Sequence, residues 1–265
     1  KLPVVFNPSV ECPNILNFFK DVLRTQDDVD TMQEIFGYLL LRENVFEKAF
    51  MFIGTTEGRN GKTKTLELMR RLIGEVNCSS ISLQNLKEDD FSISELHNKL
   101  ANIGGDLPHT NIEETGTFKK LIGRDTLNAK RKFLPDIQFT NHAKLIFSAN
   151  ATPTVLDNTD AFFNRWIILE FPFRFLIKEH YESEKETEAN VKLQNPNIIK
   201  EITTEQELSG LLNWAIEGLD RLQKNGKFTI SSSEKEIKKQ WFRRSGSLYL
   251  FLDEKIELDF FNPSS

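Results

Sequence analysis

Residues 54–63, with the sequence GTTEGRNGKT, contain the residue types that bind phosphate in proteins. The stretch ends in Gly61, Lys62 and Thr63, as the pattern G-x-x-x-x-G-K-[ST] requires, but Thr56 stands where its first glycine is expected. In such a loop, backbone N–H groups and a helix N-terminus point at phosphate oxygens, the lysine reaches the β- and γ-phosphates, and the hydroxyl binds Mg²⁺. The stretch therefore predicts a nucleotide site. The residues expected to contact the nucleotide are Gly58, Arg59, Asn60, Gly61, Lys62, Thr63 and Lys64.

Two further polar residues follow apolar runs that are typical of buried strands. Asp106 follows LANIGG and Asn150 follows KLIFSA. An acid at the end of a neighbouring strand is the usual second anchor for Mg²⁺, so Mg²⁺ is expected to bind Thr63 and Asp106. Asn150 is placed to sense the γ-phosphate or to orient water. The alternatives are that Asp106 caps the next element and that Asn150 begins a turn.

The surrounding pattern of apolar residues indicates how these groups are positioned. Short apolar runs at residues 48–54, 100–106, 144–150 and 165–173 predict buried strands, and helical spacing separates several of them. The chain is therefore predicted to be an α/β sandwich with a largely parallel sheet and a hairpin before residue 144. The turn of that hairpin is expected at the LPD of residues 134–136. The polar residues 178–197 are expected to form a solvated loop or an extended insertion.

Composition excludes several classes of protein. The chain has 265 residues, 39% hydrophobic and 28% charged, and no apolar run long enough to span a bilayer, so no membrane partner is expected. Two cysteines are too few for a disulfide framework, and the four histidines show no metal-ligand spacing. Because the sequence lacks an initiator methionine, we expect it to be a piece of a longer polypeptide.

The charge is unevenly distributed along the chain. Residues 119–144 contain seven basic residues against Asp125 and Asp136, although the whole chain carries a net charge of −5. A basic segment on an acidic body suits a protein that meets phosphates at one surface only. Within the predicted hairpin, Lys130 and Lys132 are expected on one strand face and Arg131 on the other, with Phe133 beside them. These residues predict binding to single-stranded DNA, with a solvated edge strand as the alternative.

Five motifs in order resemble the superfamily 3 helicases, in particular the C-terminal helicase modules of phage and plasmid primase-helicases. The motifs are GRNGKT, LANIGGD, FKKLIGRDTLNAKRKF, KLIFSANATP and DAFFNRWIILEFPF. The resemblance implies an AAA+ type P-loop fold with a presensor hairpin and ATP hydrolysis between the subunits of a hexameric ring. It further implies 3′-to-5′ translocation on single-stranded or forked DNA and an upstream primase-polymerase region. The element would be a plasmid or a virus, acting in the cytoplasm of a prokaryotic host.

The same resemblance implies a role for particular residues. Lys62 and Thr63 match the Walker A lysine and hydroxyl, Asp106 the Walker B acid, and Asn150 the sensor asparagine. Arg165 matches the arginine finger, which would act on ATP bound by the adjacent subunit, where charge on the γ-phosphoryl oxygens needs an external cation. The implied division is an N-terminal helical collar or oligomerisation segment (1–48), an AAA+ core (49–177), and a charged insertion with a C-terminal helical region (178–265).

The chain also departs from that pattern. Thr55 and Thr56 lengthen the loop after Gly54, and glycines precede Asp106 where a second acid often stands. Glu113 or Glu114 could supply the general base, and the sequence leaves this open. Two other functions therefore stay in consideration: an ATP-switched replication initiator that unwinds little, and a small-molecule P-loop kinase. The kinase would leave the basic hairpin and Arg165 without a role.

Overall fold

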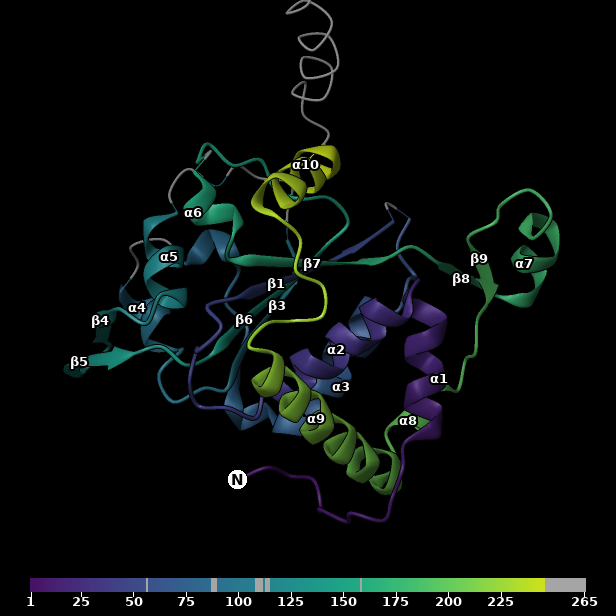
Figure 1. Cartoon of the computed structure of the whole chain (residues 1–265), viewed down its shortest axis with the longest axis horizontal. Helices are drawn as coiled ribbons and strands as arrows, with labels where there is room; N and C mark the ends of the chain where they lie inside the picture. Colours follow the sequence, from purple (N-terminus) through teal and green to yellow (C-terminus); the bar gives the residue numbers. More distant parts are fainter. Residues whose placement is uncertain (56, 87–89, 108–111, 113–114, 158, 246–265) are drawn as a thin grey trace, which may run out of the picture.

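A central sheet of five parallel strands organises the chain, in the order β2-β3-β6-β1-β7 (Figure 1). The computed structural model describes residues 1–55, 57–86, 90–107, 112, 115–157 and 159–245, and excludes the side chains of Asp90 and Asp106. The predicted α/β fold with a largely parallel sheet is confirmed. The sheet strands are β1 (Ala49–Gly54), β2 (Cys78–Ser79), β3 (Ala101–Asp106), β6 (Lys144–Ala149) and β7 (Trp166–Phe171).

The register of the sheet gathers the strand ends that the sequence singled out. Every residue of β1 and of β6 is buried, as expected for parallel strands covered on both faces. Ile53 lies opposite Ala149, and Asp106 lies opposite Ser148 after an irregularity in β3. The carboxyl ends of β1, β3 and β6 therefore lie side by side at the same end of the sheet.

Helices cover both faces of the sheet, and each face has its own core (Figure 1). Phe50 and Phe52 of β1 belong to one core, while Met51 and Ile53 belong to the other, because side chains alternate along a strand. The first core includes α1 (Pro13–Val22), α2 (Gln26–Tyr38), α3 (Lys62–Ile73), α8 (Ile198–Ile202) and α9 (Glu205–Asn225). The second includes α4 (Asp90–Ser94), α5 (Gly116–Ile122), α6 (Asp160–Phe163) and α10 (Glu234–Arg244). Short 3₁₀ turns are η1 (Glu75–Asn77) and η2 (Leu83–Asn85).

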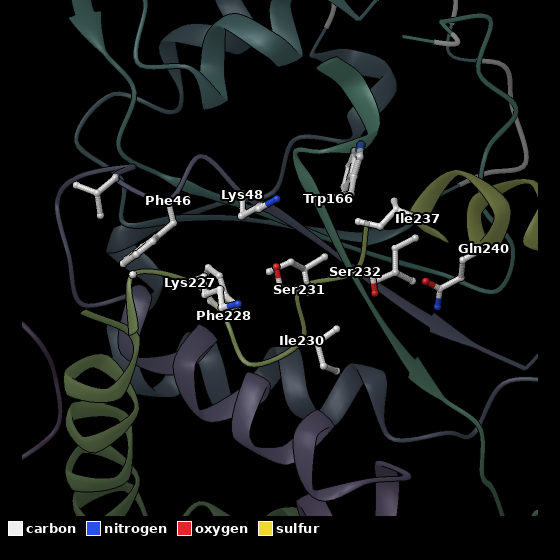
Figure 2. A pocket seen from close by; sticks show the side chains of 14 residues that line it. Phe46, Lys48, Trp166, Lys227, Phe228, Ile230, Ser231, Ser232, Ile237 and Gln240 are labelled. Atoms are coloured by element: carbon white, nitrogen blue, oxygen red, sulfur yellow. The ribbon is translucent and has the colours of Figure 1, made fainter. Parts of the chain in front are cut away.

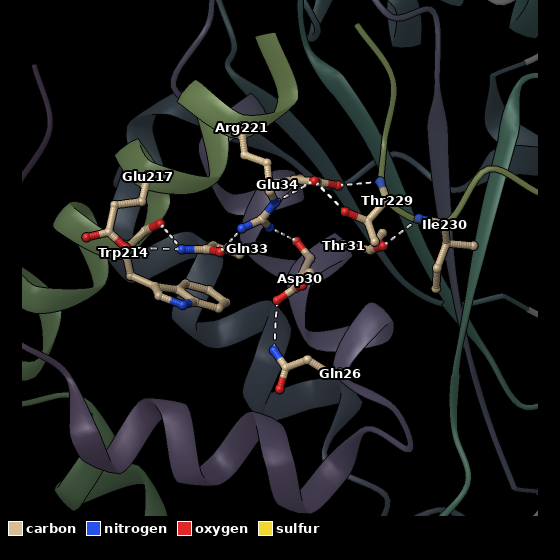
Figure 3. Close-up of polar contacts among 10 residues, drawn as sticks. All are labelled: Gln26, Asp30, Thr31, Gln33, Glu34, Trp214, Glu217, Arg221, Thr229 and Ile230. Atoms are coloured by element: carbon tan, nitrogen blue, oxygen red, sulfur yellow. Dashed lines mark hydrogen bonds and ion pairs between the residues drawn. The ribbon is translucent and has the colours of Figure 1, made fainter. Parts of the chain in front are cut away.

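A buried polar network joins α2, α9 and the segment that follows α9 (Figure 3). The carboxylate of Glu34 is fully buried and accepts from Arg221 Nε at 2.8 Å and from the Thr229 N–H at 2.7 Å. Arg221 also donates to the side chain of Gln33 at 2.6 Å. Because a buried charge is tolerated only when it is paired and hydrogen-bonded, this network fixes how the two helices pack.

The hairpin predicted before β6 is present, but its turn lies two residues earlier than expected. It consists of β4 (Thr126–Arg131) and β5 (Leu134–Thr140), which pair antiparallel. The turn lies at Lys132 and Phe133, where Phe133 adopts a left-handed φ of 62°. The prediction of a turn at 134–136 was wrong, since that segment starts β5.

The polar segment after β7 is folded, and the prediction of a solvated loop was wrong. It contains β8 (Arg174–Leu176), α7 (Lys178–Glu184) and β9 (Val191–Leu193), and β8 pairs with β9 in parallel. This small unit lies at the right of Figure 1, beyond α1. We call residues 172–195 the strap. Across the described ranges, no helix is long and apolar enough to cross a bilayer.

Candidate nucleotide-binding site

Three of the described residues in the loop between β1 and α3 have left-handed φ angles. The φ angles are 72° at Gly58, 54° at Arg59 and 89° at Gly61. Gly61 is the N-cap of α3, and within the described residues no side chain caps that helix end. Successive left-handed turns followed by an uncapped helix N-terminus direct backbone N–H groups toward one point, which is the geometry that binds anions. Thr56 lies outside the described residues.

Lys62 and Asn150 come together at this loop. Lys62 Nζ donates to Asn150 Oδ1 at 2.6 Å, and only 4% of Lys62 is exposed. A Cβ on Gly54 would lie 2.1 Å from Lys62 Nζ and 1.9 Å from Asn60 Nδ2, so any larger residue there would displace both side chains. The last residue of β1 is therefore a platform on which Asn60 and Lys62 lie.

Asn60 supplies an observation that fits a bound anion. It is 3% exposed, and its Nδ2 has no hydrogen-bond partner within the described part of the chain. A buried amide donor without an acceptor costs free energy, and a phosphate oxygen would satisfy it. The orphan amide, the Lys62 ammonium and the uncapped start of α3 together suit a polyphosphate.

Of the two residues predicted to hold Mg²⁺, the structure describes the side chain of Thr63 but only the backbone of Asp106. Thr63 is exposed at the start of α3, beside the loop. Asp106 ends β3 at the same end of the sheet, but its side chain lies outside the described residues. Thr63 and Asp106 have the oxygen chemistry that Mg²⁺ prefers. Both candidates for the general base, Glu113 and Glu114, also lie outside the described residues.

Arg165 does not join this group. It precedes β7 and lies at the amino ends of the strands, where its carbonyl accepts from the Ala49 N–H at 2.7 Å. Its guanidinium donates to the Ala161 carbonyl. Because β1 runs from Ala49 to Gly54, the phosphate loop begins about 16 Å away from that end. Arg165 therefore cannot reach the loop of its own chain.

A cavity of about 610 Å³ opens beside the phosphate loop. It lies between α1, the start of α3 and the strap, and its volume is within the range of small-molecule sites. Its apolar walls come from α1, from the strap and from the first residue of α8. The apolar wall residues are Phe18, Val22, Phe175, Ile177, Leu193 and Ile198.

A second, smaller cavity of about 190 Å³ lies at the other end of the sheet (Figure 2). The segment carrying Phe228 and Ser231 passes over the start of β7 at Trp166, and Lys48 and Gln240 also line it. Lys48 Nζ donates to the Asn164 carbonyl, and burial lowers the pKa of Lys48. This cavity lies at the amino ends of the strands, near Arg165, so it takes no part in the phosphate site.

The four residues predicted to bind DNA lie in the hairpin, away from the phosphate loop. Phe133 is 93% exposed at the tip, and Lys132 Nζ lies 5.3 Å from its ring centre. Lys130 is exposed on β4, whereas Arg131 donates from Nε and from its NH2 group to the Pro135 carbonyl within the same hairpin. The hairpin thus presents an aromatic tip flanked by cations.

Two of the seven basic residues in the predicted basic segment do not offer a free charge at an exposed surface. Lys144 is fully buried. Lys119 Nζ lies 2.8 Å from Asp157. Burial opposes ionisation of Asp157, but hydrogen bonds from Lys119, Thr115 and Thr159 outweigh it and hold its pKa well below the usual range. The expected continuous basic island is therefore smaller than the sequence indicated.

Sequence reasoning missed the contacts that residues 174 and 175 make with the phosphate loop. Phe175 N donates to the Arg59 carbonyl at 2.9 Å, and Arg174 forms an ion pair with Glu57 of the phosphate loop. Arg174 is a single arginine after an apolar strand, about 120 residues after the loop, and no sequence pattern links residues so far apart. Only the fold brings the two together.

Comparison with known proteins supports the fold and one relationship. Residues 53–165 match a family of unknown function, DUF5906. The "Putative helicase L207/L206" of Acanthamoeba polyphaga mimivirus is 25% identical over 216 residues, which are 72% of this chain and 21% of that protein. This chain thus spans about a fifth of the length of the mimivirus protein.

Solved structures of the NrS-1 C-terminal region have the same fold. An apo A form has a TM-score of 0.62 at 20% identity, covering 97% of this chain and 61% of that one. Another apo structure has a TM-score of 0.61 at 20% identity, covering 97% of this chain and 62% of that one. The predicted resemblance is confirmed at this level: the chain is a distant homologue of the mimivirus protein and shares the fold of the NrS-1 C-terminal region.

Proposed function

We propose that this chain is the ATP-hydrolysing helicase module of a viral or plasmid replication protein. The observation that carries the proposal is the pairing of Lys62 with Asn150 over Gly54, at the edge where the parallel strands end. Lys62 would hold the β- and γ-phosphates, and the Asn60 amide and the N–H groups of the loop would complete the cradle. The base and ribose would occupy the neighbouring cavity. Homology to a protein named as a helicase supports this reading.

Mg²⁺ would be held by Thr63 and Asp106 and would neutralise charge on the phosphates. Asn150 contacts Lys62 and would orient the attacking water or sense the γ-phosphate. An exposed hydroxyl at the first turn of α3 supports the role of Thr63. Asp106 is supported by its place at the end of β3, next to β6.

Arg165 would act on ATP bound by a neighbouring subunit. Its distance from its own loop supports action between subunits, because an arginine finger must lie against the γ-phosphate. A closed ring gives every subunit one such neighbour. We therefore propose a homo-oligomeric ring, hexameric as in the superfamily 3 helicases that the motifs resemble.

The hairpin would contact single-stranded DNA inside that ring. An exposed Phe133 can stack on a base, and Lys130 and Lys132 can neutralise backbone phosphates without reading sequence. Translocation in the 3′-to-5′ direction, and an upstream primase-polymerase region in the intact protein, are part of this proposal. The match to the NrS-1 C-terminal region covers 97% of this chain, and that region is itself a part of a longer protein, which supports the second point.

Substitution of Lys62 tests the proposal. Lys62→Ala should lower kcat for DNA-stimulated ATP hydrolysis by about 100-fold or more, because the γ-phosphate loses its cation. Unwinding should disappear with it. Lys224→Ala, at an exposed lysine near the end of α9, is the matched control and should hydrolyse ATP as the unmodified protein does. Undiminished hydrolysis in folded Lys62→Ala would refute the nucleotide site.

One observation favours a second function, an ATP-switched initiator with little unwinding of its own. Glycines stand at positions 104 and 105, before Asp106, and Gly104 is packed so that a Cβ would lie 2.7 Å from the ring of Phe147. Packing leaves no room for an acid at position 104, whereas a Cβ at Gly105 would meet nothing within 4 Å, so it is the sequence that lacks a second carboxylate there, and this absence weakens the case for efficient hydrolysis. Strand displacement on a forked substrate separates the two functions, since the initiator would assemble with ATP without separating the strands.

A further inference from the structure

The strap makes two kinds of contact with the phosphate loop. Its backbone bonds to the loop where Phe175 N donates to the Arg59 carbonyl at 2.9 Å. Its Arg174 side chain pairs with Glu57, which the loop carries three residues after Gly54. We propose that Arg174 is a positioning residue that neutralises Glu57 and holds the phosphate loop in the shape that binds ATP; this rests on the proposed nucleotide site.

Arg174 is the centre of an unbalanced charge cluster. Its guanidinium contacts the carboxylates of Glu57 and Glu184, and that of Glu188 at 3.2 Å. Its side chain is 16% exposed, whereas that of Glu57 is 57% exposed. Three carboxylates thus share one cation beside a loop that would hold a triphosphate. Without Arg174, the charge of Glu57 would oppose the phosphates directly.

The strap can position the loop because it is anchored elsewhere. Lys192 on β9 donates to the Asp21 carbonyl at 2.7 Å, next to the end of α1. The same ammonium lies 4.0 Å from the ring centre of Phe173. The strap is therefore held to α1 by contacts that do not involve the phosphate loop, and Arg174 connects the loop to that fixed unit.

The strap also forms one wall of the cavity beside the loop. Phe175 and Leu193 face Phe18 and Val22 of α1 across that cavity. A loop without the Arg174 side chain would keep the Phe175 N–H bond to the Arg59 carbonyl, but the Glu57 carboxylate would repel the phosphates and the loop would shift away from this wall. The expected consequence is weaker nucleotide binding, with the chemical step unchanged, since Lys62 and Asn150 are not touched.

Arg174→Gln and its combination with Glu57→Gln test this role. Arg174→Gln should raise both Kd and KM for ATP about tenfold, with kcat within about twofold of the unmodified protein. Glu57→Gln in the same chain should bring Kd back to within about threefold, because the repelling charge is gone. Lys185→Gln is the matched control: it removes a cation from the same strap at a residue whose ion pair, within the described residues, is with neighbouring Glu182, and Kd should not change.

Three results would overturn the proposal. Arg174→Gln could bind ATP as tightly as the unmodified protein; the double variant could remain as weak as Arg174→Gln, which would make the pair a tether alone; or kcat could fall as much as binding. If Arg174→Gln fails to fold, Arg174→Lys decides: it keeps the charge, so Kd should stay within about threefold, and a tenfold rise would refute neutralisation. Lys62→Ala measured alongside separates the failures, because ATP binding unaffected by Lys62→Ala refutes the nucleotide site itself.

Discussion

Two buried lysines lie near opposite ends of the parallel strands and have different surroundings. Lys62 is 4% exposed, starts α3 after β1, and donates to the side chain of Asn150. Lys144 is fully buried, starts β6, and donates to the backbone carbonyls of Leu41 and His142. Its ammonium also lies 4.7 Å from the ring centre of Tyr38. Lys62 lies at the first turn of a helix beside the phosphate loop, whereas Lys144 is enclosed at the start of a central strand.

The two lysines differ in whether the polar groups around them have hydrogen-bond partners. The groups around Lys144 are fixed backbone carbonyls and an aromatic face from the same chain, which are suitable partners for a cation. Lys62 donates to Asn150 and lies over Gly54, but the neighbouring Asn60 amide has no acceptor within the described residues. Surplus donors indicate a binding site for an anion, whereas a balanced set indicates structure.

Truncation of Lys144 should lower the stability of the fold far more than truncation of Lys62, and this is the largest effect expected. Lys144→Ala leaves a cavity and two carbonyls without a donor, so it should lower the free energy of unfolding by about 2–5 kcal/mol. Lys62→Ala should change that free energy by less than about 1 kcal/mol, because it removes a cation from a donor-rich loop. Urea unfolding of both variants measures the contrast. Equal losses would mean that Lys62 is structural as well.

A dependence on pH sharpens the comparison. Burial lowers the pKa of Lys144 to about 7, with Glu43 opposing the shift. The unfolded chain then binds the proton more tightly above pH 7, so the stability that Lys144 contributes rises as the pH increases from 7 toward 10.5. Between pH 7 and 8.5 the unmodified protein should gain about 1–2 kcal/mol relative to Lys144→Met.

The window ends at pH 8.5 for a reason. Burial raises the pKa of Cys78 to about 11, so its titration would lower stability at higher pH and obscure the gain. Unfolding free energies of both proteins at pH 7 and 8.5 provide the measurement. A constant difference would mean that the carbonyls and the Tyr38 ring keep Lys144 charged.

The sequence predicted the sheet and the phosphate loop because both depend on local pattern. Parallel strands buried on both faces appear as continuous apolar runs, and a glycine loop before Lys62 is recognisable by spacing. Burial of Lys144 was not predictable, because it depends on Leu41, which lies after α2 and about 100 residues earlier in the chain. The strap was missed because its polar sequence contains few apolar residues, and contacts of Arg174 and Lys192 hold it in place.

The hairpin lysines belong to the same basic segment as Lys144 but are exposed, and they give the smallest expected effect. Lys130→Ala with Lys132→Ala should weaken binding of single-stranded DNA about tenfold and should make its salt dependence shallower, because two phosphate contacts are lost. Lys119→Gln is the matched control, since Asp157 already compensates that charge. Phe133→Ala should weaken binding by a similar factor at every salt concentration, because stacking releases no counterions. Titrations of a labelled oligonucleotide at several salt concentrations separate these effects. If the double variant retains both its affinity and its slope, the DNA contact lies on another surface, and the exposed phenylalanine at the hairpin tip would then need a different partner.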